Sequence, residues 1–343
     1  MRRMATVTTM EERSDTPAKR GFYEPFGEYH MSWYAVMPSS ELAPGKVKST
    51  KFCDGRIAVF RGEDGAVHAM NARCKHMGAD IGLGDVVGNN VRCPFHHWEY
   101  DGSGACVRIP SGDRIPNHTT LLTFPCEDSE GLIWVFLGRE APHRAPRLAD
   151  CEEGKVLSRS FGIDFKEPLQ VEPWALTANT FDFAHFRAVH HFNMDDITKF
   201  SDGHVRGWEG DIGEQGFMRI ELHGISNVVS YLRKPGEAMK RQLGGLCPKG
   251  DEGLKLFMTI FTDLSDPSEA ARQEAEARLD EFEALHRKIA EEDLAVMNSV
   301  EFGRVRLTEG DKEVAEFLRS VQTYPRTTIR KLEAAMTDGR GAP

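Results

Sequence analysis

The chain has 343 residues, enough for two domains of ordinary size, and 40% of them are apolar, which is enough to build buried cores. Its formal net charge of −10 argues against nucleic acid or an anionic membrane as the main partner. The sequence holds no apolar run of about 18 residues, and its first residues lack the apolar centre of a secretion signal, so we expect a cytoplasmic protein with no membrane partner.

The first half of the chain predicts a short arm followed by an all-β domain. Residues 1–29 are polar and charged and predict an N-terminal arm. Short strands follow from about Trp33, including a pair within "RIAVFRGEDGAVHAMN" at 56–71 and an apolar strand within "GLIWVFLG" at 131–138. The proline-rich "REAPHRAPRL" at 139–148 predicts a joint, so we assign residues 30–145 to the first domain.

Residues 146–343 predict a second domain of mixed structure. Pro173 opens a stretch of helical spacing, and residues 204–264 read as strands with glycine-rich connections. Pro267 and Ser268 then open a long helix that reaches about residue 300. The predicted fold class is therefore α+β. It combines an all-β domain with a domain of antiparallel sheet and helices that ends in a long helix like one from a helix bundle.

Two short segments of the first domain carry residues that bind metals. They read Cys74-x-His76 and, after sixteen intervening residues, Cys93-x-x-His96. Zinc fingers usually supply the cysteines as one pair and the histidines as another, whereas each segment here supplies one of each. The mixed arrangement favours a [2Fe–2S] cluster with two thiolates on one iron and two imidazoles on the other, with tetrahedral zinc and coincidence as the alternatives. If His96 points into this site, His97 points away from it.

A second set of candidate ligands lies in "NTFDFAHFRAVHHF" at 179–192. Two histidines and one carboxylate form the usual site for a non-haem iron that binds O2, and this segment supplies His185 and His190. The two positions lie about 140° apart on an ideal helix, so we expect the helix to end or distort between them. Asp182 shares a helical face with His185 and can orient its imidazole. His191 is the second choice of ligand, and solvated or buried histidines are the alternative.

The carboxylate ligand is expected on the long C-terminal helix. An apolar stripe at helical spacing is predicted there, formed by Phe282, Leu285, Ile289, Val296 and Val300. Asp293 lies on this stripe, where an unpaired carboxylate would be costly and a bound metal would compensate for its burial. The alternative is a helix that is only partly buried at this point, with Asp293 in solvent.

Three segments resemble the Rieske non-haem iron oxygenases. Residues 74–110, "CKHMGADIGLGDVVGNNVRCPFHHWEYDGSGACVRIP", resemble the family's cluster-binding region, and residues 179–190 resemble its N-x-x-D-x-x-H-x-x-x-x-H segment. Residues 291–300, "EEDLAVMNSV", resemble its C-terminal ligand segment. The closest types in character are the ketosteroid 9α-hydroxylases and the aminopyrrolnitrin oxygenases. Respiratory Rieske proteins carry an extra cysteine at the positions of Ala79 and Phe95. Without these cysteines we expect fewer constraints on the loops, and we also expect few hydroxyl donors near the sulfurs. Both imply a reduction potential toward the low end of the Rieske range.

The resemblance implies the terminal oxygenase component of a multicomponent system, acting as a monooxygenase. It would use O2 to hydroxylate, demethylate or otherwise oxidise an apolar aromatic or steroid-like substrate. Since no nicotinamide or flavin motif is seen, electrons from NAD(P)H would arrive through a separate ferredoxin or flavin reductase. The implied ligands of the [2Fe–2S] cluster are Cys74, His76, Cys93 and His96, and those of the Fe(II) are His185, His190 and Asp293.

In the family, the aspartate at the position of Asp182 connects the iron site to a Rieske histidine of a neighbouring subunit. The resemblance therefore implies that Asp182 contacts the neighbour's equivalent of His96 in a homotrimer. Two functions from other classes compete with this interpretation. One is an electron-transfer protein whose second domain only binds a partner, and the other is a binding module stabilised by zinc.

Overall fold

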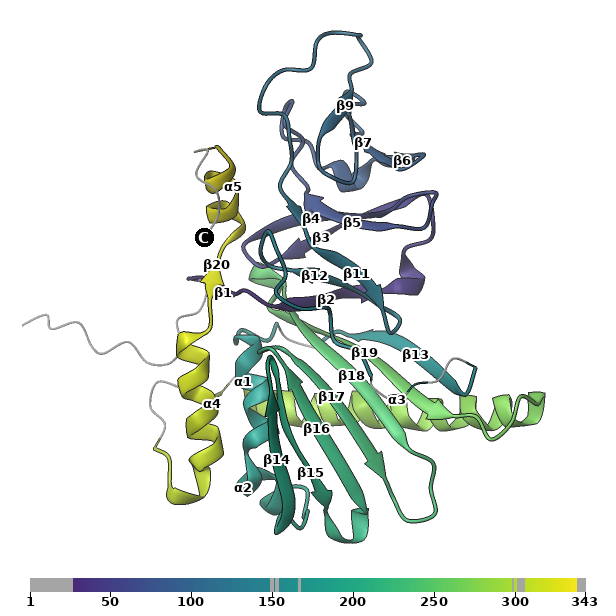
Figure 1. The fold of residues 1–343 in the computed structure, drawn as a ribbon, viewed down its shortest axis with the longest axis vertical. Coiled ribbons are helices and arrows are strands. Elements are labelled where there is room, and N and C mark those ends of the chain that lie inside the picture. Colours follow the sequence, from purple (N-terminus) through teal and green to yellow (C-terminus); the bar gives the residue numbers. More distant parts are fainter. Residues whose placement is uncertain are drawn as a thin grey trace, which may run out of the picture.

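The computed structural model describes residues 27–148, 151, 154–165, 168–297, 299–300 and 306–337, apart from the side chains of 292–295 and 337. Most of the expected N-terminal arm lies outside these residues. The described chain forms a group of small sheets from its first half and one large sheet flanked by helices from its second half (Figure 1).

The first half forms three small antiparallel sheets. The sheet β10-β5-β4-β3 consists of Thr123–Phe124, Val67–Asn71, Gly55–Arg61 and Lys46–Phe52. The sheet β11-β12-β2 consists of Cys126–Ser129, Leu132–Phe136 and Trp33–Pro38. The sheet β6-β7-β8-β9 consists of Asp85–Val87, Asn90–Arg92, Glu99–Tyr100 and Cys106–Arg108. Two 3-10 turns, η1 (Ser39–Glu41) and η2 (Ile81–Leu83), connect these strands. The strands predicted at 56–71 and 131–138 correspond to β4, β5 and β12.

The second half is built on a seven-stranded antiparallel sheet in the order β13-β19-β18-β17-β16-β15-β14. Its strands are Val156–Ile163, Leu254–Asp263, Lys240–Pro248, Asn227–Arg233, Phe217–His223, Val205–Asp211 and Asp196–Asp202. The helices are α1 (Pro173–Thr177), α2 (Phe183–Ala188), α3 (Glu269–Met297), α4 (Lys312–Thr323) and α5 (Ile329–Thr337). The described residues of this half also form the 3-10 turns η3 (Ala178–Phe181), η4 (Gly213–Gln215), η5 (Gly250–Glu252) and η7 (Glu309–Asp311).

Helix α3 covers the sheet beside β13 and β19, where Leu279 and Phe282 pack against strand side chains (Figure 1). It starts as expected, because the Ser268 hydroxyl accepts a hydrogen bond from the Ala271 amide at 3.1 Å and so caps the first turn. The predicted apolar stripe is wrong in part: Leu285 is 50% exposed and Val296 60% exposed. The buried face is carried by residues that the prediction omitted, including Ala271, Ala275, Leu279, Ala290 and Met297. Small side chains allow the helix to lie close to the sheet.

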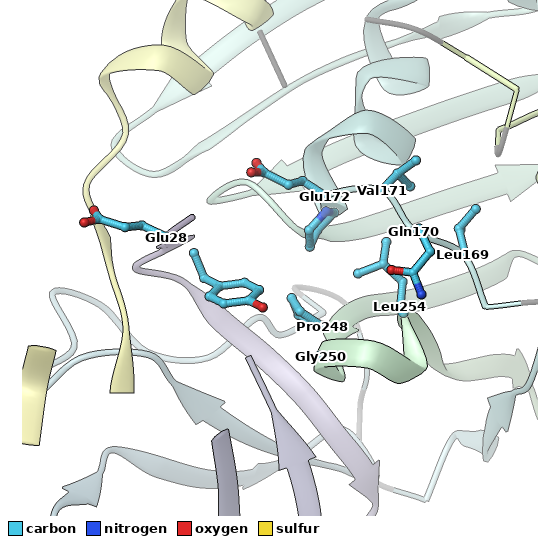
Figure 2. A pocket seen from close by; sticks show the side chains of 11 residues that line it. Glu28, Leu169, Gln170, Val171, Glu172, Pro248, Gly250 and Leu254 are labelled. Carbon is cyan, nitrogen blue, oxygen red and sulfur yellow. The ribbon is translucent and has the colours of Figure 1, made fainter. Parts of the chain in front are cut away.

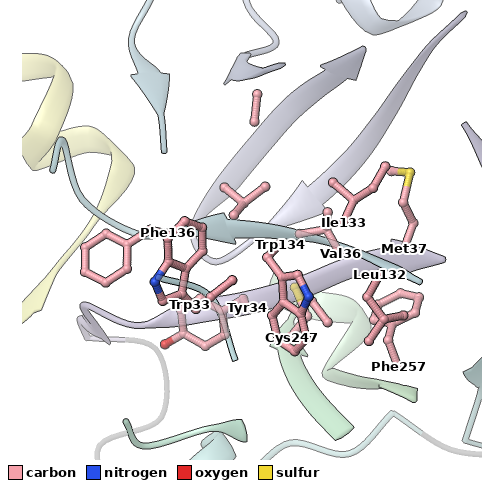
Figure 3. Close-up of a cluster of buried hydrophobic side chains, with 14 of the residues drawn as sticks. Trp33, Tyr34, Val36, Met37, Leu132, Ile133, Trp134, Phe136, Cys247 and Phe257 are labelled. Atoms are coloured by element: carbon pink, nitrogen blue, oxygen red, sulfur yellow. The ribbon is translucent and has the colours of Figure 1, made fainter. Parts of the chain in front are cut away.

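One hydrophobic core joins the two halves of the chain (Figure 3). Trp33 and Trp134 of the first half contact Cys247 and Phe257 of the large sheet within a single buried cluster. At Gly245 in β18 a Cβ atom would lie 2.8 Å from the Trp134 ring, so only glycine allows this close approach. The division at residue 145 therefore separates two sheet systems that share a core, and it stays a prediction as a domain boundary.

The C-terminal residues return to the first half of the chain. Strand β1 (Tyr29–His30) pairs with β20 (Arg326–Thr327). The Asp54 carboxylate then accepts a hydrogen bond from the Ile329 amide at 2.8 Å. Ile329 and Leu332 of α5 belong to the shared core. The described residues of the C-terminus thus complete the packing of the N-terminal sheets.

A small cavity lies where β1 meets the start of α1, between Tyr29, Glu172 and Leu254 (Figure 2). Its volume is about 20 Å³. That is room for about one water molecule, so this cavity does not hold a substrate.

A pH dependence of stability follows from His30, which is buried beside this junction. Burial and the Arg326 guanidinium lower the pKa of His30 from its ordinary 6.5 to about 4. Between these values the unfolded chain binds a proton at this position that the folded protein does not. The free energy of unfolding should therefore fall by up to about 3 kcal/mol as pH falls through this window. Denaturant unfolding at pH 7.5 and 5 measures this loss, which should be smaller in His30→Gln. An equal loss in both proteins would contradict the assignment.

Candidate metal centres

Two loops with the same backbone design carry the four predicted cluster ligands. The Gly78 amide donates to the Cys74 carbonyl at 2.8 Å, and the His97 amide donates to the Cys93 carbonyl at 3.1 Å. Gly78 and His97 have φ of 76° and 57°, so each loop reverses through a left-handed residue four positions after its cysteine. His97 therefore occupies the position that glycine holds in the first loop. His97 therefore forms the backbone turn of the second loop, which is a role other than metal binding.

The cysteines lie inside these loops and the histidines lie at the surface. Cys74 is 3% exposed and Cys93 1% exposed, whereas His76 and His96 are both exposed, with ring centroids 4.4 Å apart. Among the residues that the structure describes, no three histidine, cysteine or acidic side chains converge on one point. A structural zinc would need four ligands converging on it, whereas each iron of a [2Fe–2S] cluster of this type takes only two. The arrangement of two buried cysteines and two exposed histidines therefore fits a [2Fe–2S] cluster better than a zinc ion.

The electrostatics of the thiols also fit a metal cluster. Burial raises the pKa of the Cys93 thiol, and the neighbouring Cys74 contributes to the rise, although the amides of Phe95 and His96 partly oppose it by pointing at the sulfur. The Cys93 thiol is therefore costly to ionise without a metal. A metal that binds the thiolate removes this cost. The amides would then donate to the metal-bound sulfur.

Tyr100 is a functional residue that the sequence analysis missed. Its hydroxyl in β8 lies 3.2 Å from the Cys74 sulfur and accepts a hydrogen bond from the Lys75 amide at 3.2 Å. With a thiolate at Cys74, the phenol becomes the donor to sulfur. The inference that few hydroxyl donors surround the cluster therefore needs this correction. The available signal was an aromatic hydroxyl in the strand directly after the second loop.

Replacing Tyr100 by phenylalanine should lower the reduction potential of the cluster. The hydroxyl stabilises the more negative reduced state, and a net hydrogen bond of about 1 kcal/mol corresponds to on the order of 40 mV for one electron. Redox titration of the visible or EPR signal measures the shift in the iron-loaded protein. Tyr29→Phe is a matched control remote from the cluster loops, and an unchanged potential in Tyr100→Phe would contradict the role.

Large apolar side chains surround the two exposed histidines. Met77 is 66% exposed and Phe95 59% exposed, and each lies next to a cluster histidine in the sequence. The His76 ring stacks on Trp98, with ring centroids 4.7 Å apart and an interplanar angle of 5°. Exposed apolar groups gathered at one tip are typical of a contact surface for another protein.

The second candidate centre lies around α2. The helix ends at Ala188, between the two predicted ligands, and the ring nitrogens His185 Nε2 and His190 Nε2 lie 3.1 Å apart. If each nitrogen binds one metal ion at about 2.1 Å, the angle at the metal is about 95°. This is close to the right angle between adjacent positions of an octahedral iron site. His191 has φ of 58° and is exposed, so it follows the turn rather than joining the pair.

Asp182 caps the helix that carries His185. Its carboxylate accepts a hydrogen bond from the His185 amide at 2.8 Å, at the first turn of α2. The side chain is partly exposed. In this structure it therefore positions the backbone of His185. Its predicted contact with a histidine of a neighbouring subunit stays a prediction.

Asp293 lies within α3, but its side chain is outside the described residues. Its position follows the buried Ala290 by three residues and precedes the buried Met297 by four. Its role as the third iron ligand stays a prediction.

A cavity of about 260 Å³ lies between the large sheet, α1, η3 and α3. Its walls are mainly apolar, with contributions from Leu176, Val228, Leu256, Met258 and Ile289. Asn179 also lines it, three residues before Asp182 in the turn that leads into α2. This volume is near the lower end of the range for small-molecule sites. Asn179 thus belongs both to the cavity wall and to the segment of sequence that carries the paired histidines.

Comparisons with known proteins identify a Rieske domain in the first half of the chain. Residues 32–119 match the family model of the Rieske [2Fe-2S] domain. Over 206 residues the chain is 33% identical to a probable 3-ketosteroid-9-alpha-monooxygenase, oxygenase component, from Rhodococcus rhodochrous, covering 59% of this chain and 51% of the relative. The chain contains a Rieske [2Fe-2S] domain and is similar to Rieske oxygenases.

Solved structures extend the likeness of this Rieske chain to its whole fold. Apo dicamba monooxygenase covers 90% of this chain and 98% of its own, with 18% identity and a TM-score of 0.65. NdmA from Pseudomonas putida CBB5, solved with caffeine, covers 89% of this chain and 91% of its own, with 22% identity and a TM-score of 0.65. The predicted family and fold class are confirmed. Matches to curated relatives span 24% to 52% of those proteins' length. No helix within the described residues is long and apolar enough to span a bilayer.

Proposed function

We propose that this Rieske protein is the terminal oxygenase of a multicomponent system that oxidises a small apolar organic molecule. The observation that carries the proposal is the pair of ring nitrogens, His185 Nε2 and His190 Nε2, which lie 3.1 Å apart. Asn179, six residues before His185, lines an apolar cavity. An electron carrier alone has no need for such a site. When bound, a [2Fe–2S] cluster exchanges single electrons and an Fe(II) with three protein ligands offers open positions to O2 and substrate.

The proposed functional residues of this chain fall into two sets, one for each metal centre. Cys74, His76, Cys93 and His96 would hold the cluster, and His185, His190 and Asp293 would hold the iron. Asp182 fixes the start of α2 and so orients His185. The apolar walls of the cavity would bind the substrate body and exclude water. Relatives named for a ketosteroid or solved with caffeine support an apolar ring compound as the substrate class.

In Figure 1 the strands β6, β7 and β9, which belong to the cluster region, lie at one end of the molecule, and α2, which carries His185, lies near the other. Electron transfer within one chain would therefore cross most of the molecule. A head-to-tail homotrimer would place the exposed His96 of one chain beside the partly exposed Asp182 of the next. The apolar side chains Met77 and Phe95 would lie in that contact or face a ferredoxin or flavin reductase that draws electrons from NAD(P)H.

Iron and sulfide content tests the proposal directly. We expect about three irons and two acid-labile sulfides per chain, with the rhombic EPR signal of a Rieske cluster after reduction. Two irons per chain would indicate the electron carrier instead, and zinc without iron would indicate the binding module. A screen of apolar ring compounds with O2 and a surrogate reductase then seeks an oxidised product.

A further inference from the structure

The lining of the apolar cavity includes a buried polar atom that the described part of the chain leaves unpaired. His286 of α3 lines the cavity, and its Nε2 atom is buried without a hydrogen-bond partner in the described part of the chain. Its ring packs against Phe282, with centroids 4.6 Å apart. A buried nitrogen without a partner is costly, so a polar group that fills the cavity would gain by pairing with it.

Two other polar side chains in the cavity already have partners. The Thr177 hydroxyl donates to the Ile225 carbonyl at 2.8 Å, and the Ser226 hydroxyl donates to the Trp33 carbonyl at 3.1 Å. These groups serve the fold. Asn179 and Gln242 also line the cavity, and His286 is distinguished from them by a buried nitrogen that lacks a partner among the described residues. Burial lowers the pKa of His286 to about 4, so its imidazole is neutral at pH 7 and can either donate or accept one hydrogen bond.

The position of His286 along α3 gives its distance from Asp293, the predicted iron ligand on the same helix. His286 precedes Asp293 by seven residues of continuous helix. Seven residues return to almost the same face and advance about 10 Å along the helix axis. A polar group at His286 is therefore separated from the predicted iron by about two helical turns.

We infer that His286 is the specificity-determining residue of the cavity and binds a hydroxyl or carbonyl at one end of an elongated apolar substrate. The carbon to be oxidised lies at the other end, about 10 Å away. This inference rests on the proposed function for the location of the iron. The recognition of the polar end rests on the cavity alone.

Equilibrium dialysis with three matched probes tests the recognition in the iron-loaded protein under nitrogen. Biphenyl supplies the apolar body, 4-hydroxybiphenyl adds a hydroxyl at the far end, and 2-hydroxybiphenyl adds the same hydroxyl at the wrong position. We expect 4-hydroxybiphenyl to bind about tenfold more tightly than the other two, as one buried hydrogen bond allows. Equal affinities, or no binding of 4-hydroxybiphenyl, would overturn the inference.

Substitutions at position 286 assign the preference to the imidazole. His286→Phe should weaken binding of 4-hydroxybiphenyl about tenfold and leave biphenyl within about twofold of the wild-type value. His286→Gln, which retains a donor and an acceptor, should restore part of the preference. His118→Phe makes the same exchange at an exposed position and should leave all three affinities unchanged. An unchanged preference in His286→Phe would also overturn the inference.

The same probes separate this inference from the proposed function. Binding needs no turnover, so a preference lost in His286→Phe without any oxidation of the probes would leave the recognition standing and contradict the oxygenase. With O2 and a surrogate reductase, we expect oxidation of 4-hydroxybiphenyl on the ring remote from its hydroxyl. Oxidation on the hydroxyl-bearing ring would contradict the inferred direction of binding while supporting the oxygenase.

Discussion

Asp293→Ala should remove the mononuclear iron and reduce turnover by on the order of a thousandfold or more, while the Rieske absorbance and EPR signal remain. Two histidines alone bind Fe(II) weakly, and a catalytic metal supplies several kcal/mol of transition-state stabilisation. The cluster should persist because its four ligands lie on separate loops in the first half of the chain. Iron content falling from about three to about two per chain measures the loss.

Glu291→Ala is the matched control, because Glu291 is an exposed acid two residues away on the same helix. It should keep both the third iron and the activity. Wild-type turnover in Asp293→Ala would exclude this carboxylate as a ligand. Loss of the third iron in both variants would instead point to a general effect on α3.

Asp182→Asn should keep both metal centres but slow the use of cluster electrons by on the order of a hundredfold. The structure makes this a sharper substitution than alanine. Asparagine also caps helices well, so the hydrogen bond from the His185 amide can persist while the negative charge is lost. The rate at which the pre-reduced cluster is reoxidised after mixing with O2 and an oxidisable probe measures the effect.

Asp182→Ala removes the cap as well as the charge. It should show the same slow reoxidation together with a loss of about 1 kcal/mol of stability. A normal reoxidation rate in both variants would show that electrons reach the iron by another route. A normal reoxidation rate in Asp182→Asn with a slow rate in Asp182→Ala would show that Asp182 acts only as a helix cap.

The cluster loops could be predicted because their chemistry is local. The spacing within Cys74-x-His76 and Cys93-x-x-His96 depends on a few residues of loop, and neighbouring strands follow from alternation and turns. Tyr100 could not be assigned in this way. Its contact with Cys74 joins residues 26 positions apart and depends on how β8 lies behind the first loop.

The face of α3 was predicted only in part, for a physical reason. Large apolar residues dominate a periodicity analysis, but the buried face of the helix includes the small residues Ala271 and Ala275. Leu285 and Val296 are apolar yet exposed, so they shifted the predicted stripe. The unpaired nitrogen of His286 was likewise hidden, because only the surrounding structure shows which polar atoms lack partners.

The packing of the C-terminal residues against the first half of the chain limits which segments can be exchanged between related proteins. The matched Rieske segment, residues 32–119, is continuous in sequence, but the unit that folds around it is not. Ile329 and Leu332 fill its core, and Glu333 pairs with Lys75 at 3.4 Å, within the loop that carries Cys74 and His76. A chimera that transplants the segment alone would set foreign side chains against this helix. A transferable unit therefore needs the C-terminal residues 326–337 in addition to the cluster segment and strands β10 to β12, which complete its sheets.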